Sequence, residues 1–134
     1  QGVDSPAALD SAQQGDLTLR LSRELKTAVL ISGSEDFISN GTILWKVSGG
    51  SSLMTQVTGT GCMLSVLCGV FAAVEPDILA AAVTAAAFWK SCSRRAEALA
   101  PCQGPGSFRT ALLDAAGTLT AADCAGMAFV ELLF

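Results

Sequence analysis

The sequence predicts an α/β fold with a parallel sheet core, a β-hairpin and helices toward its carboxyl end. Three observations support this class. Residues 28–31 form a short, continuous apolar run whose length and β-branching are typical of a buried strand. Asn40-Gly41 joins two strand-like segments, and Asn-Gly is the strongest short signal for a hairpin. Residues 57–61 form a loop with two glycines that runs directly into an apolar helix.

The other elements follow from helical spacing and from turn residues. A first helix is expected mainly over residues 16–26, with Asp4 and Ser5 capping or preceding it. After it come hairpin strands over 36–39 and 42–47 and a loop over 48–52. Two helices are expected next: one over 63–74 that is apolar nearly all round, and a long Ala-rich one over 78–98 that starts near Pro76 and ends at Pro101. The rest is a turn over 103–106, a helix from a Ser107 cap through 116, one more turn capped by Thr120, and an apolar tail over 127–134 that is either a strand or an extended helix. A helix that is apolar on nearly every face is expected to be buried on most sides.

The composition limits the classes of protein to consider. At 134 residues the chain forms one domain at most. Hydrophobic residues make up 51% and charged residues only 15%, against roughly 25% charged in typical soluble proteins. We therefore expect some apolar surface to face another chain or a part of the same chain that is absent here. The net charge of −4 and the lack of a basic run argue against a nucleic-acid partner. No apolar run reaches the ~20 residues of a membrane span.

The two chain-wide signals for processing and redox state agree with a cytoplasmic protein. The start lacks Met, a basic segment and an apolar signal core, so we expect a cut or processed end rather than a secretion signal. Five cysteines without CxxC spacing favour reduced thiols. The chain has no histidine, which excludes a histidine-dependent triad and argues against a zinc site.

The glycine loop has the features of an anion site. Gly59 and Gly61 let the backbone turn tightly and approach a ligand, because neither has a Cβ. The helix start then presents unpaired N–H groups at the positive end of the dipole, where phosphate binds most often. Cys62 falls in the first turn, and the same field favours its thiolate. A glycine turn before a buried helix with a core cysteine is an equal alternative. The loop is neither a P-loop nor a dinucleotide fingerprint, because GxxxxGK[ST] is absent and Leu64 replaces the third glycine.

Ser32 is the second candidate site residue. It follows the strand predicted over residues 28–31. In an α/β layer, strand carboxyl ends and helix amino ends meet at one edge, where ligands bind. The Ser32 hydroxyl and the N–H groups of the glycine loop are therefore expected to converge on a polyphosphate. The alternative is a turn hydroxyl that bonds its own backbone.

Four segments in this order resemble hydroxyethylthiazole kinase, a member of the ribokinase-like superfamily: GVDS at 2–5, ISGSEDF at 31–37, VTGTGCML at 57–64 and GPGSF at 104–108. The cysteine after the glycine loop is the specific sign, since ribokinase-like relatives usually have aspartate there. The resemblance covers essentially the whole chain. It implies a layered α/β/α sandwich in which residues 1–134 are the carboxyl-terminal portion of a single kinase domain.

The resemblance also implies a reaction, in which the γ-phosphoryl group of ATP passes to the hydroxyl of 4-methyl-5-(2-hydroxyethyl)thiazole in thiamine biosynthesis or salvage, with Mg²⁺. By matching position, Cys62 is the catalytic residue beside the accepting hydroxyl and Gly59 contacts the substrate. ATP or its phosphate is assigned to Ser32, which stands for a threonine, and to the loop residues Thr58, Thr60 and Gly61.

Other features follow from the same resemblance. Ser34 stands where an acidic residue is frequent, and no residue here is assigned to the metal. The nucleotide-binding arginine and the metal-associated acids belong to the absent amino-terminal half. The family also implies a cytoplasmic trimer with no membrane or nucleic-acid partner, and a thiazole pocket near the subunit boundary. Two alternatives stay open: a non-catalytic fragment or pseudo-kinase that keeps the fold, and a nucleotide-binding relative of the hydrate dehydratases, against which Cys62 argues.

Overall fold

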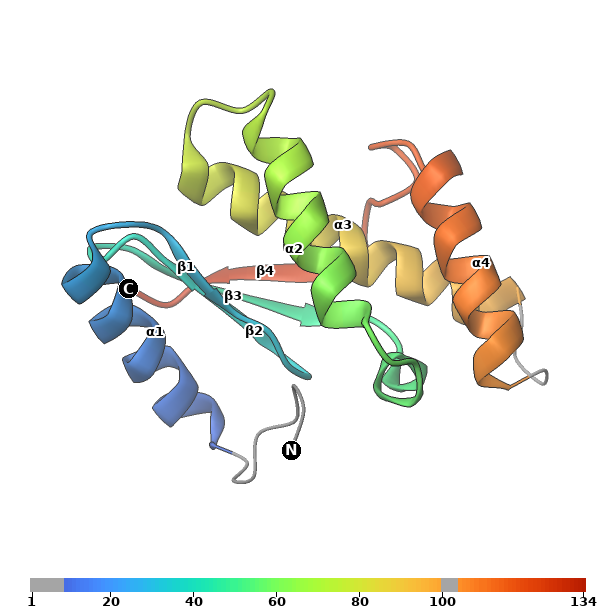
Figure 1. The fold of residues 1–134 in the computed structure, drawn as a ribbon, viewed down its shortest axis with the longest axis horizontal. Coiled ribbons are helices and arrows are strands. Elements are labelled where there is room, and N and C mark those ends of the chain that lie inside the picture. The colour runs from blue at the N-terminus through green and yellow to red at the C-terminus, as the bar shows by residue number, and fades with distance from the viewer. Residues whose placement is uncertain (1–8, 100–103) are drawn as a thin grey trace.

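The computed structural model describes residues 9–99 and 104–134 and shows an α/β arrangement of helices around one sheet (Figure 1). The elements, in chain order, are α1 (Ser11–Leu25), β1 (Val29–Ile31), β2 (Asp36–Ser39), β3 (Leu44–Gly49), the 3₁₀ turn η1 (Ser52–Gln56), α2 (Thr60–Ala72), α3 (Ile78–Leu99), α4 (Pro105–Thr118) and β4 (Ala128–Leu132). The predicted α/β class is confirmed. Among the described residues, no helix combines the length and apolar character needed to cross a membrane.

The sheet corrects one part of the prediction. Its strand order is β1-β2-β3-β4, and each of these three pairings is antiparallel, so the expected parallel core is wrong for the described strands. The reason is the short connection between β1 and β2, which spans residues 32–35. A parallel neighbour needs a crossover of about a dozen residues or more, whereas four residues return the chain antiparallel.

The Asn40-Gly41 hairpin is confirmed. β2 and β3 pair with Ile38 opposite Trp45. The Asn40 side-chain oxygen accepts hydrogen bonds from the N–H groups of Thr42 and Ile43, both at 3.0 Å. Gly41 has φ of +93°, a conformation that favours glycine. The tail adopts the strand alternative, because β4 pairs with β3.

Helices cover both faces of the sheet, which gives three layers where β2 runs (Figure 1). On one face Phe37 approaches α1 at Gly15, where an added Cβ would lie 3.6 Å from the Phe37 ring. On the other face Ile38 is completely buried in a cluster with Leu79 and Ala86 of α3. A second cluster joins α3 and α4 through Trp89, Phe108 and other apolar side chains. α3 therefore packs against the sheet and also against the helices α2 and α4.

The helix starts depend on local capping, and three of them differ from expectation, including α2, which begins at Thr60 rather than at residue 63. α1 begins at Ser11, earlier than expected, because Asp10 and Gln13 form a capping box. The Asp77 carboxylate caps α3 by accepting from the N–H of Leu79 at 2.9 Å. α4 starts at Pro105 rather than after Ser107, since proline is favoured in the first helical position. The further turn expected after Thr120 is present: residues 121–127 form turns, and the Thr120 hydroxyl accepts from the N–H of Asp123 at 3.4 Å. The predictions at Asp4, Ser5 and Pro101 lie outside the described residues.

α2 is less buried than its composition predicts. Leu64 is the buried residue of this helix, whereas Val66 is 67% exposed and Val70 is 57% exposed. Val74, which lies just after the end of the helix, is 80% exposed. The inner face packs on α3, and the outer face has no neighbour among residues 9–99 and 104–134 that covers it. The expectation of burial on most sides is therefore wrong for the described chain.

Candidate functional site

The site centres on the start of α2, where the sequence placed a glycine loop. Gly59 precedes the helix with φ of +94°, in the region that favours glycine, and no side chain caps the helix there. The N–H of Met63 donates to the carbonyl of Gly59 at 2.9 Å and closes the first helical turn. Because this is the first such bond, the N–H groups of Thr60, Gly61 and Cys62 have no intrahelical acceptor. The predicted helix after the glycine loop is confirmed, although it begins at Thr60 within the loop predicted over 57–61, and the geometry of its start suits an anion.

Ser32 and Gly61 lie next to each other. A Cβ built on Gly61 would be 3.9 Å from Ser32 Oγ, so the hydroxyl at the end of β1 faces the first turn of α2. Both residues line a cavity of about 270 Å³ together with Leu30, Leu64, Ser65 and Cys68. The predicted convergence of the strand end and the helix start therefore exists in the structure.

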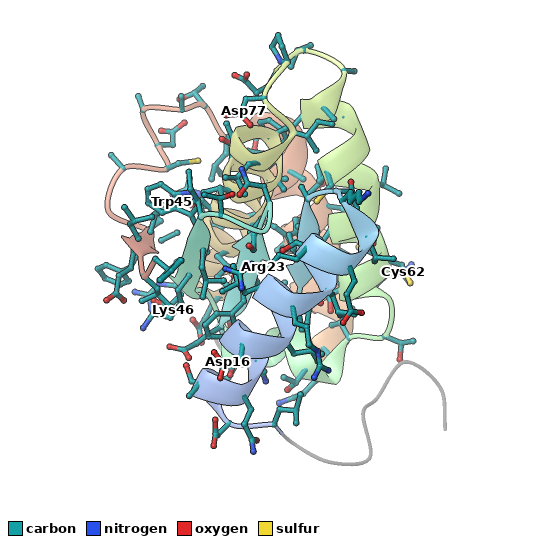
Figure 2. All side chains as sticks on the ribbon, turned by 90° about the vertical axis from the view of Figure 1, so that its left-hand side faces the viewer. Asp16, Arg23, Trp45, Lys46, Cys62 and Asp77 are labelled. Carbon is teal, nitrogen blue, oxygen red and sulfur yellow. The ribbon has the colours of Figure 1, made fainter. Side chains whose placement is uncertain are left out.

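The remaining predicted residues do not line this cavity. Thr58 is exposed in the turn before α2, and Gly59 follows it. Thr60 is held by two bonds: its carbonyl accepts from Trp89 Nε1 at 3.1 Å, and its hydroxyl donates to the carbonyl of Met54 at 3.4 Å. Cys62 is exposed and points away from the molecule on the outer side of α2 (Figure 2). Cys62 is thus not a core cysteine, which removes that alternative.

Sequence reasoning missed Ser65 and Cys68 as cavity residues. They follow Gly61 by four and seven positions, which is the spacing of one helix face, so their place could have been inferred. The Ser65 hydroxyl donates to the carbonyl of Gly61 at 3.2 Å. Burial raises the pKa of the Cys68 thiol, and the nearby Asp36 carboxylate raises it further. Cys68 is therefore a neutral, weakly polar wall of the cavity at physiological pH.

Sequence reasoning also missed a buried ion pair next to the loop over residues 32–35, which begins with Ser32. Lys90 Nζ lies 3.2 Å from Asp36 Oδ2, with both side chains about 5% exposed or less. Burial raises the pKa of the Asp36 carboxyl above its ordinary value of 3.8, while the Lys90 charge and the Gly33 N–H act in the opposite direction. The signal was available: Lys90 follows the buried Ala82 and Ala86 at intervals of four residues, so it occupies the buried face of α3.

The described cysteines are not paired with one another. They are Cys62, Cys68, Cys92 and Cys124, and Cys102 lies outside the described residues. Burial raises the pKa of Cys92 to about 12, with a smaller contribution from Cys124. Cys92 is therefore unreactive, and Cys62 is the exposed thiol at the candidate site.

The described residues do not fit a magnesium site. Among them, no group of three or more His, Cys, Asp or Glu side chains lies close enough to hold a metal ion. The Asp36 carboxylate is already bonded to Lys90 and to the Gly33 N–H. Ser34, at the position considered for a metal role, is exposed, and its carbonyl accepts from Lys90 Nζ.

Comparisons with known proteins identify the family. The profile of the Hydroxyethylthiazole kinase family matches residues 1–122. Hydroxyethylthiazole kinase of Listeria welshimeri is 42% identical over 115 residues, which cover 86% of this chain and 42% of that protein. The enzyme of that name from Moorella thermoacetica is 37% identical over 133 residues, covering 99% of this chain and 48% of the relative.

A solved structure agrees with the sequence matches. The hydroxyethylthiazole kinase protein of Pyrococcus horikoshii OT3 superposes with a TM-score of 0.85 at 31% identity, over 92% of this chain and 47% of that one. The chain thus spans a little under half the length of the relatives it matches. With the profile covering nearly all of its residues, the chain belongs to the hydroxyethylthiazole kinase family.

Proposed function

We propose that residues 1–134 are the carboxyl-terminal portion of a single ribokinase-like kinase domain that phosphorylates 4-methyl-5-(2-hydroxyethyl)thiazole with ATP. The observation that carries the proposal is the placement of Ser32 Oγ beside Gly61 at the uncapped start of α2, in a chain of this family. This arrangement offers a hydroxyl and three free N–H groups to one phosphate group.

Each predicted residue has a role in this reaction. Ser32 and Gly61 bind ATP phosphate from the cavity side. Thr60 contributes its N–H, because its hydroxyl is bonded to the carbonyl of Met54. Thr58 adds an exposed polar side chain in the turn before α2. Gly59 contacts the thiazole substrate, and Cys62 lies beside the hydroxyl that accepts the phosphoryl group.

The chemistry requires positioning and charge stabilisation more than covalent steps. The partial positive charge at the start of α2 stabilises negative charge on the transferred phosphoryl group. Cys62 orients the accepting hydroxyl and takes its proton when the thiolate is present. Magnesium neutralises charge on the nucleotide phosphates when it is bound, and its protein ligands come from outside the described residues of this chain.

The working form of the protein follows from the same family membership. We propose a homotrimer in the cytoplasm, acting on a small molecule in thiamine biosynthesis. The second candidate is a non-catalytic fragment, and one observation favours it: the chain spans 42% to 48% of the length of its relatives.

A hybrid enzyme tests the proposal. The chain is joined to the amino-terminal half of the Listeria welshimeri relative, and phosphorylated thiazole is measured with ATP and Mg²⁺. We expect ATP-dependent product from the hybrid. A folded hybrid that forms no product, under conditions in which the intact relative does, contradicts the proposed kinase activity and favours the non-catalytic fragment.

A further inference from the structure

Two adjacent residues of α3 hold the two segments that form the candidate phosphate site, which are the loop after Ser32 and the start of α2. Lys90 Nζ donates to the carbonyl oxygens of Gly33 and Ser34 at 3.3 and 3.2 Å, so it binds the loop that follows Ser32. The preceding residue, Trp89, donates from Nε1 to the carbonyl of Thr60 at 3.1 Å and so holds the start of α2. Adjacent residues of one helix therefore fix the distance between the loop after Ser32 and the start of α2.

Asp36 completes the Ser32 side of this arrangement. Its Oδ1 accepts from the Gly33 N–H at 3.0 Å, while its Oδ2 pairs with Lys90 at 3.2 Å. Gly33 is thus bonded through its N–H to the acid and through its carbonyl to the base. The backbone next to Ser32 is held on both sides by buried side chains.

We infer that Lys90, together with Asp36, is a positioning residue for phosphate binding: it holds Ser32 Oγ opposite Gly61 and keeps two carbonyl oxygens turned away from the anion. This inference rests on the proposed function, because it needs a phosphate at the start of α2. Lys90 acts through the loop and does not touch the phosphate.

Electrostatics explains why the lysine donates to carbonyls. The carbonyl oxygens of Gly33 and Ser34 lie immediately after Ser32 and carry partial negative charge. If either carbonyl oxygen rotated toward the start of α2, it would repel a phosphate and would accept hydrogen bonds from the N–H groups of α2 that the phosphate needs. Lys90 Nζ satisfies both oxygens in a buried position, where such bonds are stronger than in water. The N–H donors of Lys90 matter for this role, beyond its charge.

Two double variants separate the donor from the charge. Asp36→Asn/Lys90→Gln and Asp36→Asn/Lys90→Met both remove the ion pair and leave no unpaired charge, which proteins tolerate better than half a buried pair. The Gln variant keeps an N–H donor for the loop carbonyls, and the Met variant has none. Arg94→Met is the matched control, because Arg94 is an exposed cation on the same helix.

The measurement is the affinity of each protein for inorganic triphosphate by titration calorimetry. We expect the Met double variant to bind about tenfold more weakly than the unsubstituted chain or worse, which is the effect of losing hydrogen bonds to a positioned loop. The Gln double variant and Arg94→Met should stay within about threefold of it.

The outcomes distinguish this inference from the proposed function. Equal affinity of the Met and Gln double variants overturns the positioning role of Lys90 while the phosphate site stands. Failure of the unsubstituted chain to bind triphosphate overturns the phosphate site itself and the inference with it.

Discussion

Cys62 lies on the opposite side of α2 from the residues that line the cavity. Its thiol is exposed on the outer side of α2, whereas Ser32 and Gly61 line the cavity on the inner side. Both sides share the same helix start. In the proposed reaction, the nucleotide phosphate therefore approaches from the cavity, and the accepting alcohol approaches from the side of Cys62.

Substitution of Cys62 tests its role in turnover. In the hybrid kinase, Cys62→Ala should lower kcat by about 10²–10⁴-fold if the thiolate acts as the base, and Cys62→Asp should keep more activity because a carboxylate can accept the proton. The KM for ATP should change little. Cys124→Ala is the control, since Cys124 does not line the cavity. An unchanged kcat in Cys62→Ala would show that the thiol is only structural.

The Lys90–Asp36 pair makes a prediction about pH. Lys90→Met leaves a buried carboxylate without its cation, which costs about 3–5 kcal/mol of unfolding free energy near neutral pH. Burial already raises the pKa of Asp36, and loss of the Lys90 charge raises it further. The folded variant then binds a proton more tightly than the unfolded chain, so its free energy of unfolding falls as pH rises through that pKa.

Denaturant unfolding at about pH 4 and about pH 7 measures this effect. The stability gap between Lys90→Met and the unsubstituted chain should be smaller at the lower pH, because the raised pKa of Asp36 in the variant favours its neutral form there. Arg94→Met should show little gap at either pH. A gap for Lys90→Met that is the same at both values would mean that Asp36 does not carry an uncompensated charge in the variant.

At the scale of elements, α2 offers two glycines for comparison. Gly59 precedes the helix at φ of +94°, whereas Gly69 lies within the helix and does not have a positive φ. A Cβ added at either position would meet nothing within 4 Å, so any effect of alanine is conformational rather than steric.

Alanine at these two positions should have opposite effects on thermal unfolding. Gly59→Ala should destabilise the chain by about 1–2 kcal/mol, because an L-residue is strained in the left-handed region. Gly69→Ala should stabilise it by about 0.5–1 kcal/mol, the usual gain over glycine in a helix interior. Destabilisation by Gly69→Ala would indicate that another element packs against this position in solution.

Local signals predicted the elements well where the structure depends on neighbours in sequence. The Asn40-Gly41 hairpin and the helix start after Gly59 rest on backbone conformations that few residues adopt. The direction of pairing between β1 and β2 was missed because an apolar run looks the same in either orientation. The spacing of Lys90 from Ala82 and Ala86 indicated that it lies on the buried face of α3, but its pairing with Asp36 was hidden because the two residues lie more than fifty positions apart in the sequence.

At the scale of the whole molecule, apolar surface is the main unexplained feature. Val66 and Val70 lie four residues apart on the outer side of α2, Val74 follows just after the end of the helix and is also exposed, and Ile78 at the start of α3 is 59% exposed. β1 lies at an edge of the described sheet. Such surface is typical of a protein that associates with another chain or with the rest of its own domain.

We therefore expect the isolated chain to self-associate and to lack thiazole kinase activity. Sedimentation velocity should show a mass that increases with concentration. Val66→Gln/Val70→Gln should reduce this association, whereas Leu25→Gln/Leu99→Gln, which changes equally exposed leucines elsewhere, should reduce it less. A well-behaved monomer with full ATP-dependent activity would overturn this expectation.

The central claim is that Ser32 and the start of α2 bind one phosphate group. Titration of inorganic phosphate into the ¹⁵N-labelled chain, followed by amide chemical shifts, tests it most directly. The predicted result is a single saturable change at the amides of Gly59 to Cys62 and at Ser32, with smaller changes elsewhere. Saturable changes confined to the starts of α3 or α4, or no change at the start of α2 at any phosphate concentration, would contradict the claim.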